Sequence, residues 1–548
     1  MASEVAGDQR ILANLVARRA YEDPDLDVLT FVDVEPDGRL STELRSYGQL
    51  WDNGRRVAAA LLAAGMQAGQ RFALLMHNHP EFVEAMVGSA IAATVFVPLD
   101  ARMRGEKLAF MLGFAQCQGV ICADYAVQNL RPLLGSLPEL RWVWVMRTGV
   151  RAELPQAGCD VHWLADVLPA VIPQMRVAVT EPDSTMQMLF SSGTTGDPKA
   201  ILASYSRYYG VATIGALLGW NDDERPYTGL SLTHANAQLI TLGNTLYGGL
   251  RGVISRRFTK SRLWDICREF GCTTFNLLGG MTTAIYGEPA RADDPDNPVR
   301  FVLSAGMPIA IWEDFARRFN VQIFEFYAAA EGGMTLNPPG QGPVGSIGKP
   351  PPSLEARIVD ENDRECPPGV QGEIVFRNAD GSCPQVTYFG DPQASSSKTN
   401  EGWLRMGDVG HRDAAGWFYF DYRKGGALRH NGTFVNTGFV EKAIAEHASV
   451  SDVFVYGVDA LSAAPGERDV VAAVVPEPGE TFIADDLFRH CLDTLERDCV
   501  PTYIQVMDEI PKTASEKPQE RICLAHFQAH PELIFRRQPS AGRAGDVS

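Results

Sequence analysis

The sequence predicts an α/β protein, and three observations lead to this fold class. Segments typical of buried strands alternate with segments typical of helices between residues 47 and 333. Short strands separated by turns follow from about residue 340, and strand–helix alternation returns toward the C-terminus. The chain has 548 residues, of which 45% are apolar and 21% charged, so it is long enough for several domains with large cores.

The first alternation covers residues 47–99. Residues 47–65 carry a helical apolar stripe, and residues 71–76 form an apolar run with the length of a buried strand. Residues 80–93 are again helical in pattern, and residues 94–99 predict a second strand. This order predicts a parallel sheet covered by helices. The side chains expected to face the core from the first helix are Leu50, Val57, Leu61 and Leu62.

The same order recurs twice before residue 340. In the first passage, residues 251–255 and 273–278 predict strands on either side of a helix at 260–271. In the second passage, a helix at 308–319 separates two strand-like runs. Both passages therefore predict further strand–helix–strand units with parallel strands.

Pro and Gly become frequent after residue 340, and the strands become shorter. Residues 355–360, 372–378 and 416–422 predict strands of a small β-rich subdomain. The segment 422–432 ("YRKGGALRHNG") contains two adjacent glycines between patterned segments, which predicts a hinge.

Residues beyond this segment predict a separate small α/β domain. Strand-like runs at 452–459 and 470–477 precede a helical pattern at 484–499. The final residues, 536–548, have the composition of a disordered tail.

Composition and charge exclude several classes of function. The formal net charge of −18, with no run of Lys or Arg, disfavours binding to nucleic acid or to an anionic membrane. No apolar run is long enough to span a bilayer, and the N-terminal residues lack the apolar core of a signal peptide. The ten cysteines form no C-x-x-C pair, which predicts neither a zinc site nor a disulfide framework. We therefore expect a cytoplasmic protein with free thiols.

The segment 191–199 ("SSGTTGDPK") combines hydroxyl side chains, glycines and a lysine after an apolar run. Glycines allow successive backbone N–H groups to converge and form an anion-binding nest. The hydroxyl groups and Lys199 would add donors and a positive charge, which suits a polyphosphate. The segment is not a Walker A loop, because Gly196 is followed by Asp197 and Pro198. A loop of this composition in isolation is more often a surface turn, so the assignment depends on the rest of the chain.

Further motifs follow in a fixed order over most of the chain. They are "SSGTTGDPKA" (191–200), "LSLTHANAQ" (230–238), "LSAGMP" (303–308), "FYAAAEGG" (326–333), "GWLRMGDVGHRDAAGWFYFDYR" (402–423) and "IPKTASEKPQER" (510–521). Together they resemble the motifs of the ANL superfamily of adenylate-forming enzymes, and most closely those of its acyl- and aryl-CoA ligases. Several ordered motifs are far more specific than any one of them alone.

This resemblance implies a particular architecture. The N-terminal domain, residues 1–422, would contain two doubly wound α/β subdomains and a small β-barrel-like subdomain. A small mobile α/β domain with a catalytic lysine would follow at residues 423–535, and residues 536–548 would form the tail. In the family this C-terminal domain rotates between the two half-reactions, and the resemblance places Gly425 at the hinge.

The resemblance also implies an activity and its cofactors. The enzyme would join a carboxylic acid to ATP, giving an acyl-adenylate and pyrophosphate, and would then transfer the acyl group to CoA with release of AMP. Because the carboxylate must attack a phosphate, the site has to gather positive charge and N–H donors around two anions. ATP, Mg²⁺ and CoA are therefore the expected ligands, and a homodimer is a further expectation taken from the family.

The resemblance to the family motifs implies catalytic and metal-binding roles for four residues and for Thr194. Lys199 would bind phosphate, and Lys517 would reach the α-phosphate and the carboxylate during adenylation. Glu331 would ligate Mg²⁺ together with Thr194, and His234 would lie beside the acyl carboxylate.

Nucleotide and acyl contacts follow from the same motifs. Asp408 would accept hydrogen bonds from the ribose hydroxyls, and Arg423 would support the ribose or a phosphate. The remaining nucleotide-binding residues implied are Ser191, Ser192, Gly193, Thr194, Thr195, Gly196, Gly306, Tyr327, Ala328 and Ala330. The acyl pocket would be lined by His234, Gly279, Gly280, Ala305, Gly306, Ala328 and Ala329.

The sequence departs from the family pattern at several of these places. Ala330 replaces a threonine before Glu331, and Ala328 replaces a glycine. Gly425 stands where the family commonly has Asp or Lys, and Glu516 replaces the glycine before Lys517. The phosphate loop and the main catalytic residues remain, so these changes put the rate and the acceptor in question rather than the reaction.

Alternatives stay open at this point. The chain has no fused carrier with a G-G-x-S site, which favours CoA as acceptor but leaves loading of a separate carrier protein possible in principle. A third hypothesis is that the protein is a nucleotide-binding regulatory relative of these enzymes with weak catalysis. Small residues in the acyl-pocket segments predict a bulky hydrophobic acid, whether fatty, branched or aryl. These segments contain no Lys or Arg, which argues against a second carboxylate on the substrate.

Overall fold

The structure is a computed structural model with side chains. It describes residues 7–150, 152–155, 158–190, 199–423, 428–430, 433–435, 437–459, 468–495, 499–513 and 518–537. The chain divides into two compact units. The first unit comprises Met1–Gly193, Asp197–Ala356 and Phe376–Leu404, and the second comprises Thr194–Gly196, Arg357–Val375 and Arg405–Ser548. Each unit is described by itself.

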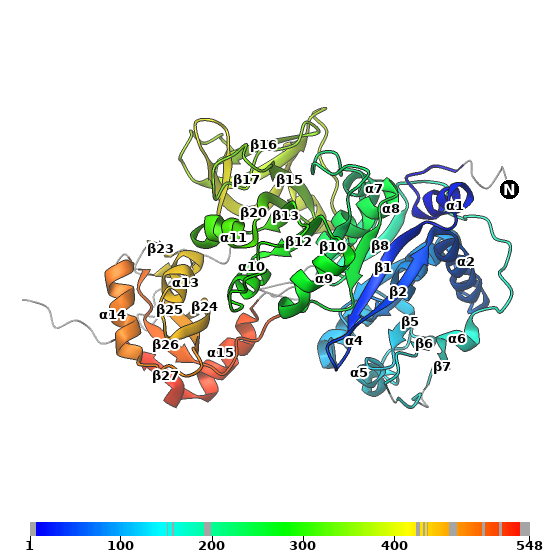
Figure 1. Ribbon diagram of the computed structural model, residues 1–548, viewed down its shortest axis with the longest axis horizontal. Helices are drawn as coiled ribbons and strands as arrows, with labels where there is room; N and C mark the ends of the chain where they lie inside the picture. Colours follow the sequence, from blue (N-terminus) through cyan, green and yellow to red (C-terminus); the bar gives the residue numbers. More distant parts are fainter. Residues whose placement is uncertain are drawn as a thin grey trace, which may run out of the picture. The chain divides into compact units, whose positions relative to one another are not determined.

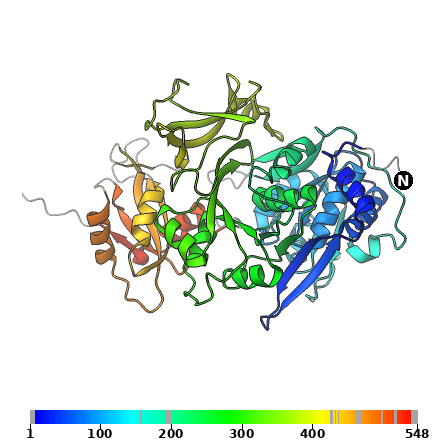
Figure 2. The same cartoon turned by 45° about the horizontal axis from the view of Figure 1, so that its top comes forward.

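An eight-stranded sheet in the first unit carries most of the predicted acyl-site residues. Its strand order is β15-β14-β13-β12-β10-β11-β1-β2. Strands β14, β13, β12, β10, β11 and β1 run parallel to their neighbours, whereas β15 and β2 pair antiparallel at the two edges (Figure 1). The strands are β1 (Asp27–Val34), β2 (Leu40–Ser46), β10 (Pro226–Thr228), β11 (Gly252–Ser255), β12 (Thr274–Leu278), β13 (Phe301–Ala305), β14 (Gln322–Ala329) and β15 (Gly332–Asn337). The β1–β2 pair is visible as the long dark-blue hairpin in Figure 2.

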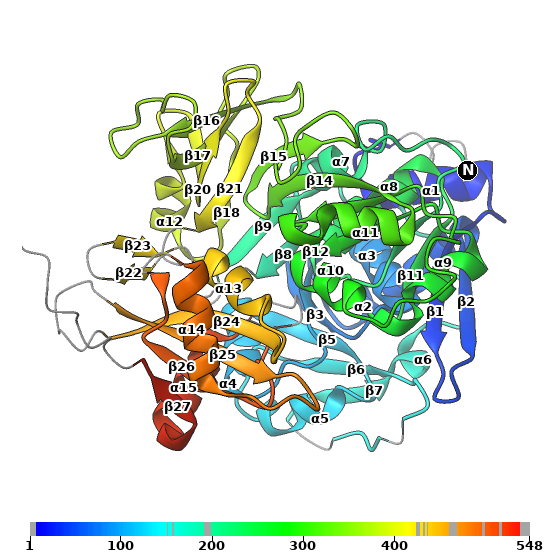
Figure 3. The ribbon, with the colours of Figure 1, turned by 60° about the vertical axis from the view of Figure 1, so that its left-hand side comes forward.

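A second eight-stranded sheet in the same unit carries the segment that leads to the predicted phosphate loop. Its order is β18-β9-β8-β4-β3-β5-β6-β7, and β3, β5, β6 and β7 lie next to one another in Figure 3. The strands are β3 (Arg71–Leu75), β4 (Val95–Leu99), β5 (Cys117–Ala123), β6 (Trp142–Met146), β7 (Asp160–Trp163), β8 (Thr185–Phe190), β9 (Ala200–Ser204) and β18 (Thr387–Tyr388). Strands β8 and β9 flank the predicted phosphate loop and pair antiparallel.

The helices α2 (Tyr47–Ala63) and α3 (Pro80–Ala92) contribute to one hydrophobic core that also contains side chains from both sheets. Helix α2 begins with a capping box, in which the Ser46 hydroxyl accepts from the N–H of Gln49 and the Gln49 side chain accepts from the N–H of Ser46. Every residue of α3 except Glu81 is buried, which is the pattern of a helix covered on all sides. The predicted stripe on α2 is wrong at Leu62, which is 47% exposed because it points away from the face that Leu61 buries.

The helices of the described chain have the following bounds. They are α1 (Leu12–Glu22), α2 (Tyr47–Ala63), α3 (Pro80–Ala92), α4 (Gly105–Phe114), α5 (Val127–Leu130), α6 (Leu164–Val167), α7 (Tyr205–Ala212), α8 (Asn244–Gly248), α9 (Leu263–Phe270), α10 (Gly279–Tyr286), α11 (Trp312–Phe319), α12 (Pro392–Ser397), α13 (Thr437–Ala445), α14 (Ala484–Thr494) and α15 (Glu520–Ala529). Among them, none combines the length and the apolar character that crossing a membrane requires.

A five-stranded sheet forms the small β-rich part, and the division between the two units runs through it. Its strands are β16 (Leu354–Val359), β17 (Gly372–Asn378), β19 (Thr399–Asn400), β20 (Trp403–Arg412) and β21 (Phe418–Arg423). The second unit also contains the hairpin of β22 (Leu428–His430) and β23 (Thr433–Val435), and a four-stranded sheet of β24 (Val450–Asp459), β25 (Arg468–Pro476), β26 (Tyr503–Val506) and β27 (Ile534–Arg536). This sheet shares a core with α13 and α14, which confirms the predicted C-terminal α/β pattern.

Candidate nucleotide and acyl site

The predicted acyl-pocket residues gather at one edge of the first sheet. Strands β10, β12, β13 and β14 are parallel neighbours, so their carboxyl ends meet at the same edge. Ala305 ends β13, Ala328 and Ala329 end β14, and His234 follows β10 along the chain. Gly279 and Gly280 begin α10 directly after β12. A crevice at the carboxyl ends of parallel strands is the usual ligand site of an α/β sheet.

His234 is held by a short polar chain that leads to β12. Its Nδ1 atom accepts a hydrogen bond of 3.2 Å from the N–H of Asn236. The Asn236 side-chain oxygen accepts in turn from the Asn276 amide at 2.6 Å, and Asn276 is a buried residue of β12. A π-helix, Asn236–Gly243, follows directly; such helices are rare and are frequently found at functional sites.

Glu325 on β14 supports the loop that contains Gly306. Its carboxylate accepts from the N–H of Gly306 at 2.6 Å and from the N–H of Met307 at 3.1 Å. Gly306 has a φ of 101°, a value that disfavours residues with a side chain. Burial raises the pKa of Glu325 to about 8, although the two backbone donors act to lower it.

Glu331 lies at the tip of the β14–β15 hairpin. Ala329 pairs with Gly332 across the turn, which leaves Ala330 and Glu331 between the two strands. Gly332 and Gly333 have φ values of 130° and 72°, so the turn requires glycine at both positions. The hairpin therefore presents the Glu331 carboxylate beyond the end of the parallel strands.

Several polar side chains converge on Glu331. The hydroxyl of Tyr388 donates to its Oε1 atom at 3.0 Å, and the Lys398 Nζ atom lies 4.0 Å from the same oxygen. Lys199, directly before β9, places its Nζ atom 5.3 Å from the centre of the Tyr388 ring. The Arg207 guanidinium donates to the Ala330 carbonyl oxygen. Burial lowers the pKa of this guanidinium, although the nearby Glu331 acts to raise it.

The surroundings of Glu331 are compatible with a magnesium ion bound together with a polyphosphate. Mg²⁺ prefers hard oxygen ligands and commonly takes one or two carboxylates together with substrate phosphates and water. Glu331 offers such a carboxylate. Within the described part of the chain, no group of three or more His, Cys, Asp or Glu side chains could hold a metal by itself.

Asp408 lies in the second unit, on β20. It is buried, at 3% exposure, and its backbone pairs with that of Arg423 on β21. The predicted ribose-binding residues are thus opposite one another in one antiparallel pair. The remaining predictions Ser191, Ser192, Gly193, Thr194, Thr195, Gly196, Gly425 and Lys517 lie outside the described residues.

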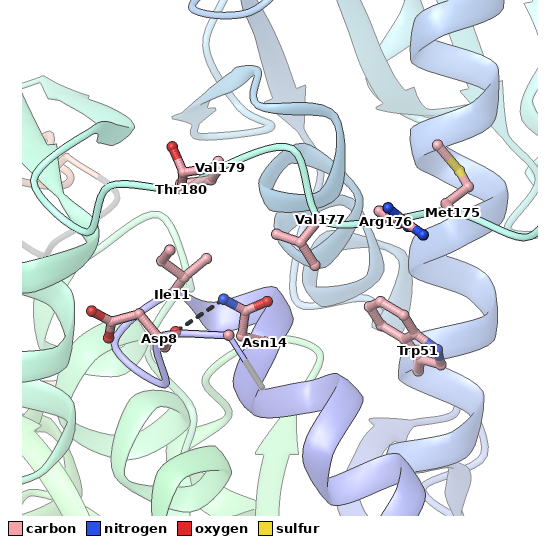
Figure 4. A pocket seen from close by; sticks show the side chains of 10 residues that line it. Asp8, Ile11, Asn14, Trp51, Met175, Arg176, Val177, Val179 and Thr180 are labelled. Carbon is pink, nitrogen blue, oxygen red and sulfur yellow. Dashed lines mark hydrogen bonds between the residues drawn. The ribbon is translucent and has the colours of Figure 1, made fainter. Parts of the chain in front are cut away.

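A separate cavity of about 350 Å³ lies elsewhere in the first unit. Its walls come from the N-terminal segment, α1, α2 and residues 175–180, and include Asp8, Asn14, Trp51 and Arg176 (Figure 4). None of the predicted site residues lines it.

Comparison with known proteins establishes the family. The model of the AMP-binding enzyme family matches residues 16–382, and that of the AMP-binding enzyme C-terminal domain matches residues 440–517. The chain belongs to the AMP-binding enzyme family. This confirms the resemblance inferred from the sequence motifs.

Relatives of this AMP-binding enzyme include named CoA ligases. The crotonobetaine/carnitine–CoA ligase of Citrobacter koseri is 26% identical over 483 residues, which is 86% of this chain and 91% of the relative. The enzyme of the same name from Escherichia coli O7:K1 is 27% identical over 483 residues, with the same coverage.

Solved structures show the same fold. The anthranilate CoA ligase AuaEII in complex with anthranoyl-AMP superposes with a TM-score of 0.80 at 21% identity, over 95% of this chain and 98% of that one. A benzoate CoA ligase from Burkholderia xenovorans LB400 gives a TM-score of 0.77 at 22% identity, over 94% and 99% of the two chains. These likenesses confirm the predicted architecture of a large α/β N-terminal domain followed by a small C-terminal one.

The motifs did not identify every polar residue of the site in this AMP-binding enzyme. Tyr388, Arg207 and Lys398 surround Glu331 but were not predicted. They come from β18, α7 and the residue after α12, and no spacing in the sequence connects them.

Proposed function

We propose that this AMP-binding enzyme is an ATP-dependent carboxylic acid:CoA ligase. It would form an acyl-adenylate and pyrophosphate, and then an acyl-CoA thioester and AMP. The observation that carries this proposal is the convergence of Lys199, Tyr388 and Glu331 beside the strand ends that hold the predicted acyl pocket. The relatives named as crotonobetaine/carnitine–CoA ligases support the choice of CoA as acceptor.

In this proposal the residues around Glu331 bind the phosphates of ATP and the magnesium ion that accompanies them. Lys199 would bind the β- and γ-phosphates together with the loop Ser191–Gly196, and Glu331 would hold Mg²⁺, with Thr194 as a second ligand. Bound there, Mg²⁺ would neutralise charge on the phosphate oxygens. Tyr388 would keep the Glu331 carboxylate in one orientation, because its hydroxyl donates to Oε1.

Nucleoside contacts would come from several of the motif residues. Asp408 would accept from the ribose hydroxyls, and Arg423 would support the ribose or a phosphate. Gly306 and Tyr327 would contact the adenylate, together with Ala328 and Ala330.

Lys517 would provide the positive charge at the α-phosphate. In the proposed mechanism it stabilises the negative charge as the carboxylate attacks, and it moves with the C-terminal domain about a hinge at Gly425. His234 would lie beside the acyl carboxylate and close the acyl pocket.

The acyl pocket favours a bulky hydrophobic acid. Ala305, Gly306, Ala328 and Ala329 are small residues at adjoining strand ends, and we expect an acid bound there to find more room than beside large side chains. The pocket would also use Gly279 and Gly280. Fatty, branched and aryl acids are therefore the proposed substrates, and acetate should be a poor one.

Exchange of radiolabelled pyrophosphate into ATP tests the adenylation step. Lys517→Ala should reduce exchange by at least a hundredfold, since it removes the charge opposite the α-phosphate. Lys512→Ala is a matched control, because the Lys512 Nζ atom forms an ion pair of 2.5 Å with Asp452. Equal exchange by wild type and Lys517→Ala would contradict the proposed role of Lys517.

The acceptor is tested separately. Adenylation without thioester formation in the presence of CoA would indicate another acceptor, such as a carrier protein. An absence of exchange with every acid in a broad panel would instead support a nucleotide-binding role without catalysis.

A further inference from the structure

The structure gathers several positively charged side chains around Glu331. Lys398 lies 4.0 Å from the Glu331 carboxylate, and its side chain is 20% exposed. Arg207 is half-buried and contacts Ala330, the residue before Glu331. The Lys199 Nζ atom lies over the ring of Tyr388. All of them belong to the first unit, within a chain whose formal net charge is −18. A local cationic cluster in an acidic protein indicates an anionic ligand.

Arg207 is positioned by its own helix. Helix α7 directly follows β9, which begins next to Lys199. The Ser204 hydroxyl caps the helix by accepting from the N–H of Arg207 at 3.3 Å, so Arg207 lies in the first turn. The guanidinium then reaches the tip of the β14–β15 hairpin, where it donates to the Ala330 carbonyl.

Arg207 lies next to position 330, where this chain has an alanine in place of the threonine of the family pattern. Ala330 cannot donate to a phosphate, whereas a guanidinium has several N–H groups arranged as a fork that matches phosphate oxygens. Among the described residues, the Arg207 side chain donates to one acceptor, the Ala330 carbonyl oxygen. Its other N–H groups remain suited to a second acceptor.

The desolvation of Arg207 supports the same conclusion. Arg207 is half-buried, so its guanidinium is partly removed from water. A partly desolvated cation interacts more strongly with an anion than a cation in water does.

We propose that Arg207 and Lys398 bind the β- and γ-phosphates of ATP, and the pyrophosphate that leaves, together with Lys199. The inference rests on the proposed function and adds two residues that the motifs do not contain. As the α–β phosphate bond breaks, negative charge moves onto pyrophosphate, and both side chains would stabilise it there.

Calorimetric titration of the full chain tests this inference directly. The ligands are ATP, inorganic pyrophosphate and AMP, each measured with and without Mg²⁺, and the variants are Arg207→Gln and Lys398→Gln. Each substitution should weaken ATP and pyrophosphate binding on the order of tenfold, because a charge-assisted hydrogen bond is lost. AMP has no β- or γ-phosphate, so its affinity should stay within about twofold of wild type.

Two further variants separate this role from a structural one. Arg207→Lys should recover part of the ATP affinity, since it keeps the charge but not the fork. Arg56→Gln is the matched control, because Arg56 is a half-buried arginine that also donates to a carbonyl oxygen, that of Pro169, at 2.9 Å. It should leave all affinities unchanged.

The possible failures are distinguishable. Unchanged ATP and pyrophosphate affinities in both Gln variants would overturn the inference while leaving the proposed function intact. Equal losses for ATP and AMP would also overturn it, because they would place the effect away from the β- and γ-phosphates. A wild-type protein that binds neither ATP nor AMP would overturn the proposed function itself.

Discussion

Replacing Glu325 by Gln should change how the stability of the protein depends on pH. The carboxyl group is buried on β14 beneath the Gly306 loop, and burial raises its pKa from the ordinary value of 4.5 to about 8. Between these values the folded chain keeps the proton that the unfolded chain releases. The resulting stabilisation is complete below about pH 4.5 and is lost as the pH rises through about 8.

The size of this effect follows from linkage. At about 1.4 kcal/mol for each pH unit, the change in pKa corresponds to roughly 5 kcal/mol of unfolding free energy. A glutamine has the same shape but no proton to release, so Glu325→Gln should lack this loss. Part of this loss already occurs below pH 5. Whatever the substitution costs at pH 5, the variant should therefore gain roughly 4 kcal/mol relative to wild type by pH 9.

Urea unfolding of both proteins at several pH values between 5 and 9 provides the measurement. Other buried acids such as Glu81, whose pKa is raised to about 7, titrate in the same range, but they cancel in the difference between the two proteins. Glu361→Gln, at an exposed turn, is the control and should show a constant difference. A difference for Glu325→Gln that stays within about 0.5 kcal/mol across this range would refute the reasoning.

Two further substitutions test other parts of the structure. Tyr388→Phe removes the hydroxyl that donates to Glu331 Oε1 and should weaken Mg²⁺-dependent ATP binding about tenfold; unchanged calorimetric affinity would contradict this. Gly348→Ala should lower the unfolding free energy by more than about 3 kcal/mol, because the added Cβ would lie 2.1 Å from the backbone of Leu336. Gly340→Ala also has a positive φ but meets nothing within 4 Å, so thermal unfolding should show a loss of about 1 kcal/mol; equal losses at the two sites would be inconsistent with this packing.

Much of the fold follows from patterns that act over short distances in the sequence. The helix predicted at 47–65 and the strand predicted at 71–76 are α2 and β3, because apolar periodicity and a capping box specify them locally. The one wrong core residue is Leu62, since its neighbour Leu61 already occupies the inward position on the helix. Strand order could not be predicted in this way, because no local pattern indicates that β10 lies between β11 and β12.

The candidate site divides in the same way. Motif residues such as Glu331 and Asp408 could be proposed as candidates from the sequence, because each lies within a recognisable motif; their roles stay predictions. Arg207 and Lys398 could not, since their closeness to Glu331 depends on how α7, the β14–β15 hairpin and the segment after α12 pack together. The support that Glu325 gives to Gly306 likewise exists only once β13 and β14 are paired.

Mass spectrometry of a single reaction tests the proposed ligase activity most directly. The reaction contains the full chain, ATP, Mg²⁺, CoA and a mixed panel of fatty, branched, aryl, amino and short-chain acids. We expect AMP, pyrophosphate and the CoA thioester of a bulky hydrophobic acid, with little acetyl-CoA or propionyl-CoA. Formation of ADP in place of AMP, or no acyl-adenylate and no thioester from any acid, would contradict the proposal that this AMP-binding enzyme is an acid–CoA ligase.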